Sequence, residues 1–396
     1  MRVLLISDYA APTGGAEVSL LVLREALRRR GHEVLFLSTR ARHEPASEAD
    51  AHCYGTRTRL RTLLQVANPW AAAAVRRAVA AFRPDVAHVA LFLTQLSPLA
   101  LLPLRGVPTL YHAHWYRATC PTGTRLLPSG GDCISAAGVV CWRAGCVPTL
   151  RTAPLLVQFQ LLRRAAAFRL VVAPSEAVAL ALRPAGLGRV VVIPPGVPSR
   201  PARPPLVEPP SVVFAARLEH EKGVLVLADA FARARRALPD ARLVIVGDGS
   251  ETTALQERIA SHGMGGSVER TGFLERDALE RVSNPAWVQA VSSLWAEPFG
   301  LVAAEAMMRG TAVIASDTGG LREIVRHGET GLLVPRGDVE QLANALVSVL
   351  SDRGRAESYG RAGRVRAEAH YSVEAFAAAF ESAYRQIAGN GAGSVA

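Results

Sequence analysis

The stretch Glu297-Pro298-Phe299-Gly300-Leu301-Val302-Ala303-Ala304-Glu305 places two carboxylates on either side of a turn and a short apolar run. The run 301–308 predicts a buried helix, because nearly all of its residues are apolar. Glu305 lies inside it, and a buried carboxylate is costly unless a partner satisfies it. A ribose could do so by donating two hydrogen bonds. Free N–H groups at the start of this helix favour phosphate, so the stretch predicts a nucleotide site.

Strand-like and helix-like runs alternate along the rest of the chain, which predicts an α/β fold. The strand-like runs are rich in β-branched residues and leucine without clean alternation, as in parallel strands that are covered on both faces. The runs predicted as strands are 2–7, 33–38, 86–91, 109–114, 170–173, 190–193, 211–216, 242–246, 268–272, 288–292, 312–315 and 331–334. The runs predicted as helices include 16–30, 70–82, 155–168, 223–238, 252–261, 301–309, 339–350 and 373–387.

A proline-rich segment divides this alternation into two arrays. Eight of the 25 prolines fall in 194–210, and proline favours extended linker conformations. We therefore expect two doubly wound, Rossmann-like domains facing each other across a cleft, 1–193 and 211–370. The final segment 371–396 is expected to be helical, and it either closes the second domain or crosses back to the first.

Composition and charge restrict the class of protein. The 396 residues are 49% hydrophobic and 20% charged, which is typical of a globular chain with two cores. No run approaches the roughly 18 apolar residues of a membrane span, so we expect a cytoplasmic protein. The net charge of +11 is expected first of all to form a solvated basic surface; the functional alternatives are attraction to anionic nucleotides, to acidic acceptors or to the anionic inner face of a membrane. No nucleic-acid motif accompanies it, which argues against a nucleic-acid partner.

Two cationic side chains lie near the start of the second array. Arg217 and Lys222 follow the strand predicted at 211–216, and strand ends of an open α/β sheet face the ligand. Arginine can hold a diphosphate as a fork, and lysine as a point charge. The alternative is a surface ion pair between Lys222 and Glu219.

Several glycines follow predicted strands. Gly247 and Gly272 lie where a glycine allows a sharp turn or close approach of a ligand, and Phe273 could offer backbone groups to a base. Gly14 and Gly15 precede the first helix, where phosphate is favoured. The alternative is that these are only turns. No G-x-G-x-x-G follows the first strand, which argues against an ordinary dinucleotide-binding dehydrogenase.

Paired carboxylates of the Asp-x-Asp type are missing from the chain. Such pairs often hold a nucleoside diphosphate through a divalent cation. We therefore expect no metal ion or other cofactor at the active site. Arg217 and Lys222 would instead neutralise the leaving phosphates.

These pieces together resemble glycosyltransferase family 4. The opening stretch, continued through Ala306-Met307-Met308-Arg309-Gly310 to Asp317-Thr318-Gly319-Gly320-Leu321-Arg322-Glu323-Ile324-Val325, is similar to its pattern E-P-F-G-x-x-x-x-E-A-M-x-x-G…G-G-x-x-E-x-V. Arg217-Leu218 with Glu221-Lys222-Gly223 is similar to its R-L-x-x-x-K-G element. The resemblance covers nearly the whole chain. It implies the GT-B fold and a retaining, hexosyltransferase-type enzyme that moves a sugar from a nucleoside diphosphate (UDP or GDP type) to an acceptor hydroxyl.

The resemblance also implies roles for individual residues. Arg217 and Lys222 would hold the donor diphosphate, Glu305 the ribose, and Glu297 the donor sugar. The donor-binding backbone would comprise Gly14, Gly15, Gly247, Gly272, Phe273, Phe299, Gly300, Leu301 and Val302. A double displacement needs a carboxylate nucleophile on the far face of the sugar, and no site carboxylate other than Glu297 is identifiable. The resemblance therefore implies that the acceptor hydroxyl attacks from the same face as the leaving phosphate, which accepts its proton.

A histidine in the first array completes the expected catalytic group. The segment 111–121 resembles the family's H-D-x-W-x-x-x-C-P. Counting back from Cys120 identifies His114 as the active-site histidine. His112 is the alternative, because Trp115 stands where the family often has aspartate.

Four cysteines fall within a loop-rich insertion, 115–150. In a cytoplasmic enzyme such a group favours a metal over disulfides. We therefore expect a structural zinc or other metal held by Cys120, Cys133, Cys141 and Cys146. The alternative is a set of reduced thiols.

Other functions on the same architecture are a phosphorylase, a nucleotide-sugar epimerase, or a non-catalytic nucleotide-binding scaffold at a membrane complex. A pyridoxal-phosphate phosphorylase needs a lysine that we cannot assign, and a scaffold would tolerate loss of Arg217, Lys222 or Glu297. The acceptor is not encoded in any decodable pattern. A lipid-linked sugar, an envelope polymer and a small natural product all fit.

Overall fold

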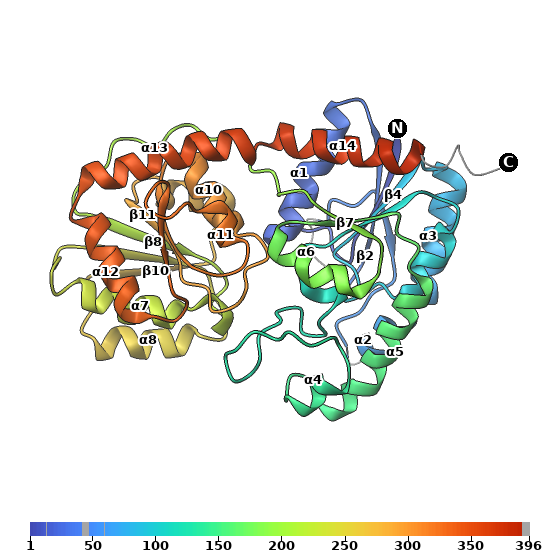
Figure 1. Cartoon of the computed structure of the whole chain (residues 1–396), viewed down its shortest axis with the longest axis horizontal. Helices are drawn as coiled ribbons and strands as arrows, with labels where there is room; N and C mark the ends of the chain where they lie inside the picture. Colours follow the sequence, from blue (N-terminus) through green and yellow to red (C-terminus); the bar gives the residue numbers. More distant parts are fainter. Residues whose placement is uncertain (13, 42–46, 59, 390–396) are drawn as a thin grey trace. The chain divides into compact units, whose positions relative to one another are not determined.

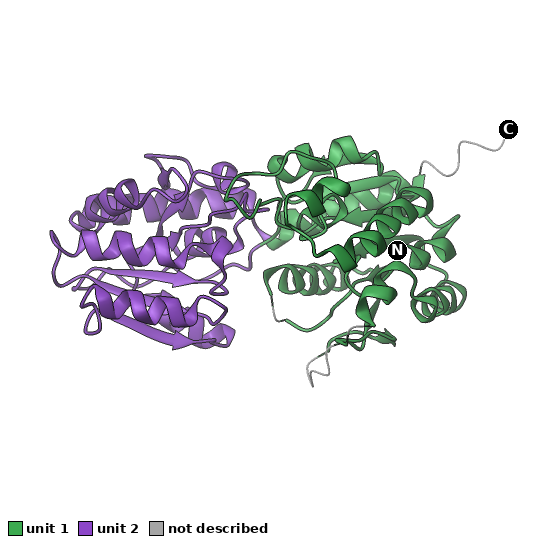
Figure 2. Cartoon of the chain, turned by 90° about the horizontal axis from the view of Figure 1, so that it is seen from below, with its two compact units in different colours: residues 1–196, 373–396 green, residues 197–372 purple. Residues whose placement is uncertain are grey.

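The computed structural model describes residues 1–12, 14–41, 47–58 and 60–389. The chain forms two compact units (Figures 1 and 2). Unit 1 consists of Met1–Gly196 and Val373–Ala396, and unit 2 of Val197–Ser372. The C-terminal helix, α14 (Val373–Gly389), therefore belongs to unit 1. Residues 390–396 of the expected C-terminal segment lie outside the described residues.

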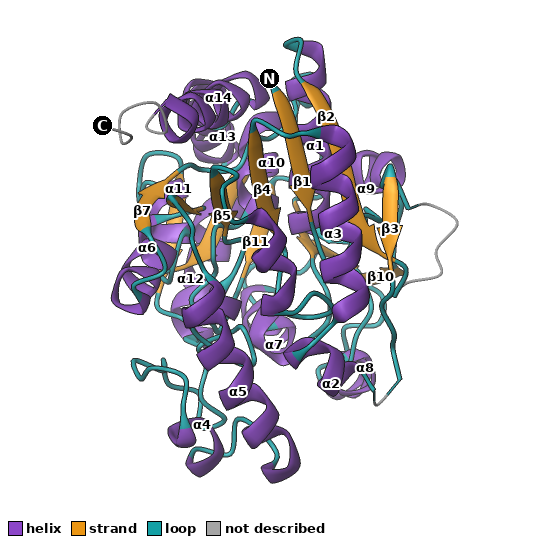
Figure 3. Cartoon of the chain, turned by 90° about the vertical axis from the view of Figure 1, so that its right-hand side faces the viewer, coloured by secondary structure: helices purple, strands orange, loops and turns teal. Residues whose placement is uncertain are grey.

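Unit 1 contains a seven-stranded sheet in the order β3-β2-β1-β4-β5-β6-β7. All of its pairings are parallel, and Figure 3 shows β2, β1, β4 and β5 side by side. The order reverses direction between β1 and β4, as in a Rossmann-like sheet. The strands are β1 (Arg2–Ile6), β2 (Glu33–Thr39), β3 (Ala51–Cys53), β4 (Val86–Ala90), β5 (Thr109–His112), β6 (Leu170–Ala173) and β7 (Arg189–Val192).

Helices cover both faces of this sheet. Val3 and Leu5 of β1 share a buried cluster with α1 and α14, while the alternate residues Leu4 and Ile6 are buried on the other face. The α-helices of this unit besides α14 are α1 (Gly15–Arg29), α2 (Arg61–Val66), α3 (Pro69–Phe82), α4 (Val139–Arg143), α5 (Thr149–Ala165) and α6 (Glu176–Leu182). The 3₁₀ helices are η1 (Pro98–Leu104), η2 (Tyr116–Ala118) and η3 (Arg183–Ala185).

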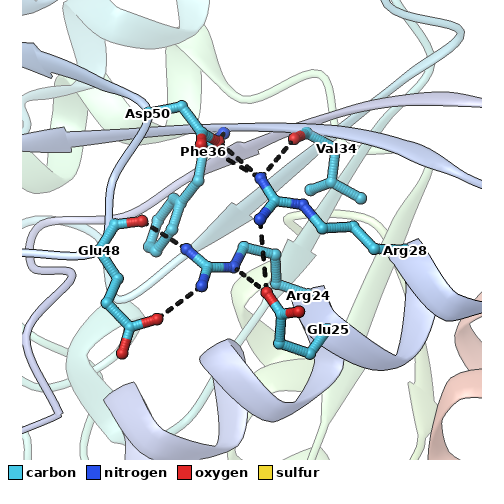
Figure 4. Close-up of polar contacts among 7 residues, drawn as sticks. All are labelled: Arg24, Glu25, Arg28, Val34, Phe36, Glu48 and Asp50. Carbon is cyan, nitrogen blue, oxygen red and sulfur yellow. Dashed lines mark hydrogen bonds and ion pairs between the residues drawn. The ribbon is translucent and has the colours of Figure 1, made fainter.

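Two arginines of α1 form hydrogen bonds with the segment that precedes β3 (Figure 4). Arg24 donates to the backbone oxygen of Glu48 and, at 2.5 Å, to its carboxylate. Arg28 donates to Asp50 at 3.0 Å, and Asp50 in turn accepts from the backbone N–H of Phe36 in β2 at 2.7 Å. These bonds hold the short β3 at the sheet edge, where it has few apolar contacts of its own.

Unit 2 contains a six-stranded sheet in the order β10-β9-β8-β11-β12-β13, again with parallel pairings. The strands are β8 (Ser211–Ala215), β9 (Arg242–Val246), β10 (Val268–Gly272), β11 (Val288–Val291), β12 (Ala312–Ser316) and β13 (Gly331–Val334). Its helices are η4 (His220–Lys222), α7 (Val224–Ala234), α8 (Thr252–Ser261), α9 (Arg276–Ser283), α10 (Leu301–Arg309), α11 (Leu321–Ile324), α12 (Val339–Leu350) and α13 (Arg353–His370). One buried cluster joins the sheet to α7, α8 and α12, and another joins it to α10 and α11.

The predicted fold class is confirmed, since both units are Rossmann-like α/β domains. Several elements differ from the sequence prediction, which did not name the short helices α2, α4, α6, α9 and α11. Strand β3 was not expected. Helix α5 begins at Thr149 and not at residue 155, because Pro154 lies inside the helix and does not mark its start. The long α13 was not expected because it buries mainly alanine and glycine, which leave no clear apolar periodicity. None of the described helices combines the length and apolarity needed to cross a bilayer.

Candidate functional site

A buried ion pair lies in unit 2. The Lys222 Nζ donates to both carboxylate oxygens of Glu297, at 2.8 and 3.1 Å. Glu297 Oε2 also accepts from Ser293 Oγ at 2.8 Å and from Trp295 Nε1 at 2.7 Å. The Lys222 ammonium lies 5.0 Å from the centroid of the Trp295 ring. The structure thus brings together two of the predicted catalytic residues, and Lys222 pairs with Glu297 instead of Glu219.

Glu297 is ionised in this surrounding. Burial alone would raise the pKa of this carboxyl, but Lys222, Ser293 and Trp295 outweigh burial and lower the pKa below its ordinary value. The side chains of Lys222 and Glu297 are only 17% and 12% exposed. The ammonium and carboxylate are therefore held in fixed positions, as a charge-stabilising site requires.

Gly223 explains how Lys222 reaches this position. Its φ of +68° lies in the left-handed region, and an added Cβ would come within 2.0 Å of the Ser292 carbonyl oxygen. Only glycine allows the chain to pass this close to the segment that follows β11. The glycine of the R-L-x-x-x-K-G element therefore brings Lys222 next to the residues that lead to Glu297.

The turn between Glu297 and α10 packs on a glycine pair. Gly320 donates its N–H to the Glu297 carbonyl at 2.7 Å. A Cβ on Gly319 would lie 2.3 Å from that carbonyl oxygen, and one on Gly320 would lie 2.8 Å from Phe299 Cα. Gly300 caps α10 with a φ of +113°. The two distant parts of the motif are therefore one packed unit, which presents the N-terminus of α10.

Glu305 has few protein partners. Its carboxylate makes no hydrogen bond to any described residue, and its ion contact is with Arg276 at 3.8 Å. Burial raises the pKa of its carboxyl, and Arg276 and Arg309 act against burial. Among the described residues, no hydrogen bond or ion pair links Glu305 to Arg217 or Lys222, the cationic groups expected beside it. Arg276 was not identified from the sequence, because a charged residue at the start of a helix is usually only solvent-exposed.

Glu280 and two further arginines complete the charges around Glu305. Arg200 and Arg309 lie 3.2 and 3.3 Å from the Glu280 carboxylate. Buried guanidinium nitrogens of Arg200, Arg276 and Arg309 have no hydrogen-bond partner within the described part of the chain. This group therefore has unused donors beside the unused acceptors of Glu305.

The ends of β8, β9 and β10 meet at one edge of the sheet. A Cβ on Gly247 would lie 1.9 Å from the Ala216 carbonyl oxygen, so this loop packs directly on the chain that leads to Arg217. Asp248 accepts from the Phe273 backbone N–H at 2.9 Å. Phe273 is 63% exposed. The predicted donor residues Gly247, Gly272 and Phe273 thus lie near one another.

Arg217 is exposed at this edge. Its side chain is 66% exposed and lies 3.5 Å from Glu221. A long exposed guanidinium with one weak partner can move toward an anion.

In unit 1, His114 lies just beyond β5, and its side chain is the first of three histidine side chains that contact one another in turn. Its ring centroid is 3.9 Å from that of His112. His112 Nδ1 lies 3.2 Å from His88 Nε2, and His88 Nδ1 lies 2.6 Å from the Tyr384 hydroxyl. Burial lowers the pKa of His114 to about 3, so its imidazole is neutral near pH 7. His112 is fully buried whereas His114 is partly exposed, which favours His114 as the histidine that meets a ligand.

Asp8 is a buried carboxylate that the sequence analysis missed. It accepts from the backbone N–H groups of Thr94, Gln95 and Leu96 at 2.7, 2.8 and 2.6 Å. Burial raises its pKa to about 7, while these bonds and Arg117 act to lower it. Asp8 therefore holds the loop after β4 against the end of β1. Its place directly after the first predicted strand was the available signal.

Gly14 and Gly15 form the start of α1, as expected, with Gly14 extended at φ −146°. The first turn carries Glu17, and a Cβ on Gly14 would lie 2.6 Å from its carboxylate. An acidic side chain beside this helix N-terminus weakens its attraction for phosphate.

The four cysteines of the insertion are free thiols. Over the described ranges, no group of three or more histidine, cysteine, aspartate or glutamate side chains is placed to hold a metal ion. The arrangement does not fit a preformed zinc site. The structural metal therefore stays a prediction, which metal analysis of natively purified protein tests.

Sequence comparison identifies the class to which this fold and site belong. Residues 199–366 match the model for glycosyl transferases group 1, and residues 13–200 match the model for Glycosyltransferase Family 4. The two matches together span both units. The chain belongs to glycosyltransferase family 4.

Individual relatives match this chain in part. Glycogen synthase of Mycobacterium tuberculosis (strain H37Rv) is 34% identical over 203 residues, which is 50% of this chain and 49% of that protein. A GDP-mannose-dependent α-(1-6)-phosphatidylinositol monomannoside mannosyltransferase of the same strain is 35% identical over 179 residues, which is 44% of this chain and 46% of that protein. The chain thus spans about half the length of the curated relatives it matches.

Solved structures match over nearly the whole chain. Sucrose-phosphate synthase from Thermosynechococcus elongatus has a TM-score of 0.74 at 25% identity and covers 98% of this chain and 100% of its own. Anabaena HepE in complex with UDP-glucose has a TM-score of 0.71 at 21% identity and covers 98% of this chain and 100% of its own.

Proposed function

We propose that this chain is a retaining glycosyltransferase that moves a sugar from a nucleoside diphosphate to an acceptor hydroxyl, with no metal ion at the diphosphate. The observation that carries the proposal is the pair Lys222–Glu297, which is buried beside the N-terminus of α10 and held by Ser293 and Trp295. Family membership supports the reaction class.

Glu305 supports a nucleotide as the donor's leaving group. Its carboxylate accepts no hydrogen bond from any residue that the structure describes, and burial raises its pKa. Both observations mean that the charged carboxylate is poorly satisfied by the protein alone. Two ribose hydroxyls would donate to it and restore the interactions that burial removes. The exposed Phe273 and the loop at Gly247 lie at the sheet edge where a base would stack.

The leaving group is stabilised by cations of the chain itself. As the bond between sugar and phosphate breaks, negative charge grows on the diphosphate. The Lys222 ammonium, the exposed Arg217 guanidinium and the N–H groups at the start of α10 all favour that charge. Glu297 fixes the ammonium and offers its carboxylate to the donor sugar. The proposed proton path is from the acceptor hydroxyl to the leaving phosphate, on the same face of the sugar.

His114 is assigned to the sugar and acceptor side of the reaction. Its neutral imidazole can accept or donate a hydrogen bond, and its buried Nε2 has no partner within the described chain. The donor is a UDP-sugar or a GDP-sugar, as the resemblance to glycosyltransferase family 4 implies. The GDP-mannose dependence named for one relative favours a GDP-sugar.

A hydrolysis and transfer assay tests this function. Purified protein is incubated with individual UDP- and GDP-sugars, and released nucleoside diphosphate is measured with and without EDTA. We expect release from one donor, unaffected by EDTA and abolished in Glu297→Gln. Glu33→Gln, an exposed carboxylate at the start of β2, is the matched control and should behave like the wild type. No release from any donor, or release that requires a divalent cation, contradicts the proposal.

A further inference from the structure

The positive charge of the chain is concentrated in one segment. Residues 51–175 contain 14 arginines, no lysine and only two acidic residues, Asp85 and Asp132. This surplus of 12 charges exceeds the net charge of +11 for all 396 residues. The rest of the chain is therefore close to neutral, and the basic character belongs to a part of unit 1.

Three helices of this segment form one surface of unit 1. α5 contacts both α2 and α4, and the three lie close together in Figures 1 and 3. None of the three contains an acidic residue. We call this the α5 surface.

Large apolar side chains are exposed on the α5 surface. Leu150 is 93% exposed and Leu63 is 63% exposed, and Trp142 is 45% exposed with its indole N–H bonded to Thr149. The other exposed apolar residues on these helices are Val139, Val140 and Val157. Side chains of this size are normally buried, so a cluster of them on adjacent helices indicates a contact surface.

The same helices α4 and α5 also carry arginines without ion partners among the described residues. Arg143, Arg151, Arg163 and Arg164 are exposed. No ion pair or side-chain hydrogen bond joins the guanidinium group of any of these four to another residue in the described part of unit 1. Their charges are free to bind an external anion.

We propose that the α5 surface binds the anionic face of a lipid membrane. An anionic bilayer attracts the arginines and admits Trp142, Leu150 and Leu63 to the boundary between headgroups and acyl chains. A nucleic acid or acidic polysaccharide matches the charge but gives no site for fully exposed leucine. A second copy of this chain would have to bring the five arginines of its own α2, α4 and α5 against those of the first, with no acidic residue on these helices to offset them, which disfavours self-association.

This inference does not rest on the glycosyltransferase activity. It assigns the chain a lipid surface as its partner, whatever the reaction. For a glycosyltransferase, the consequence is that acceptors embedded in that surface are presented to unit 1.

Vesicle co-sedimentation of the full chain tests the proposal. The vesicles contain phosphatidylcholine alone or phosphatidylcholine with phosphatidylglycerol. One variant removes apolar contacts (Trp142→Ser with Leu150→Ser), and another removes charge (Arg143→Gln with Arg151→Gln). The matched control, Leu180→Ser with Val365→Ser, changes side chains that are 61% and 69% exposed outside the α5 surface.

The wild type should bind the anionic vesicles at least about tenfold more strongly than the neutral ones, and salt should weaken the binding. The apolar variant should lose about tenfold or more of this binding, and the charge variant about fivefold per arginine. The control should bind like the wild type, and thermal unfolding should confirm that all variants are folded.

Three results would overturn the proposal. One is equal, weak binding of the wild type to both vesicle types. Another is an apolar variant that binds as the wild type does while DNA or heparin competes fully, since that result identifies a general polyanion surface. The third is a concentration-dependent dimer that the apolar variant abolishes, since that result assigns the surface to a second copy.

Discussion

Lys222 and Glu297 are the residues on which the site depends most. Each would be a poorly solvated charge without the other, because both side chains are mostly buried. Removing one partner of a buried pair leaves an uncompensated charge, which usually costs about 3 kcal/mol or more. The sequence motifs identified both residues as site residues, but they could not show that the two side chains form an ion pair with each other. Residues separated by 75 positions meet here only because β8 and β11 are neighbours in the sheet.

We predict that Lys222→Met destabilises unit 2 by about 3 kcal/mol at neutral pH. In the wild type the pKa of Glu297 is lowered, so its contribution is present above the ordinary carboxyl pKa and is lost as the pH falls through the lowered value. In the variant burial dominates and raises that pKa, so the deficit should shrink as the solution is acidified. Denaturant unfolding at several pH values measures both effects.

Arg217→Met is the control for this prediction. Arg217 is exposed, and surface substitutions of this kind change stability by no more than about 0.5 kcal/mol. Nucleoside diphosphate affinity should nevertheless fall in this variant. A Lys222→Met protein as stable as the wild type would contradict the assigned pair.

At the scale of elements, most strands and several helices could be predicted from the sequence. The bounds of β9, β10, β13, α8, α10 and α12 agree with the predicted ranges, because each has a clear apolar pattern and turn residues at its ends. β3 could not be predicted, since it is held by Arg24 and Arg28 of α1 and not by its own apolar residues. The approach of Arg276 to Glu305 could not be predicted either, because Arg276 lies on a separate helix, α9, whereas Arg309 follows Glu305 by four residues on α10 itself.

The glycine before α7 gives a prediction about how this element positions the site. Gly223→Ala should cost about 3 kcal/mol or more, because the left-handed backbone and a clash with the Ser292 carbonyl add together. Gly263→Ala is the matched control, since Gly263 has a similar φ of +61° but open space around it. It should cost only about 1 kcal/mol. Thermal or denaturant unfolding compares the two, and equal costs would refute the packing argument.

At the scale of the molecule, each unit has its own apolar core. The core of unit 1 includes Phe380 of α14, and a core of unit 2 includes Met307 of α10. The C-terminal helix therefore completes the first domain, although more than 170 residues of the second domain separate it from the rest. Periodicity along the chain could predict this helix but not the sheet on which it packs.

We predict two unfolding transitions in calorimetry, each reporting one unit. Phe380→Ala should lower the transition of unit 1, and Met307→Ala that of unit 2, each by about 2–5 kcal/mol of unfolding free energy. A nucleoside diphosphate should raise only the transition that Met307→Ala lowers, since a ligand stabilises the fold that binds it. Substitutions that shift both transitions equally would contradict independent cores.

The most direct test of the account is a calorimetric titration with UDP or GDP and with the corresponding 2′,3′-dideoxynucleotide, on the wild type and on Glu305→Gln. If Glu305 binds the ribose, loss of the hydroxyls should weaken binding to the wild type at least about tenfold, as for hydrogen bonds to a charged group. The variant should bind both forms with similar, weakened affinity. Equal binding of the two nucleotides by the wild type, or undiminished discrimination by Glu305→Gln, would contradict the assignment of Glu305 to the ribose.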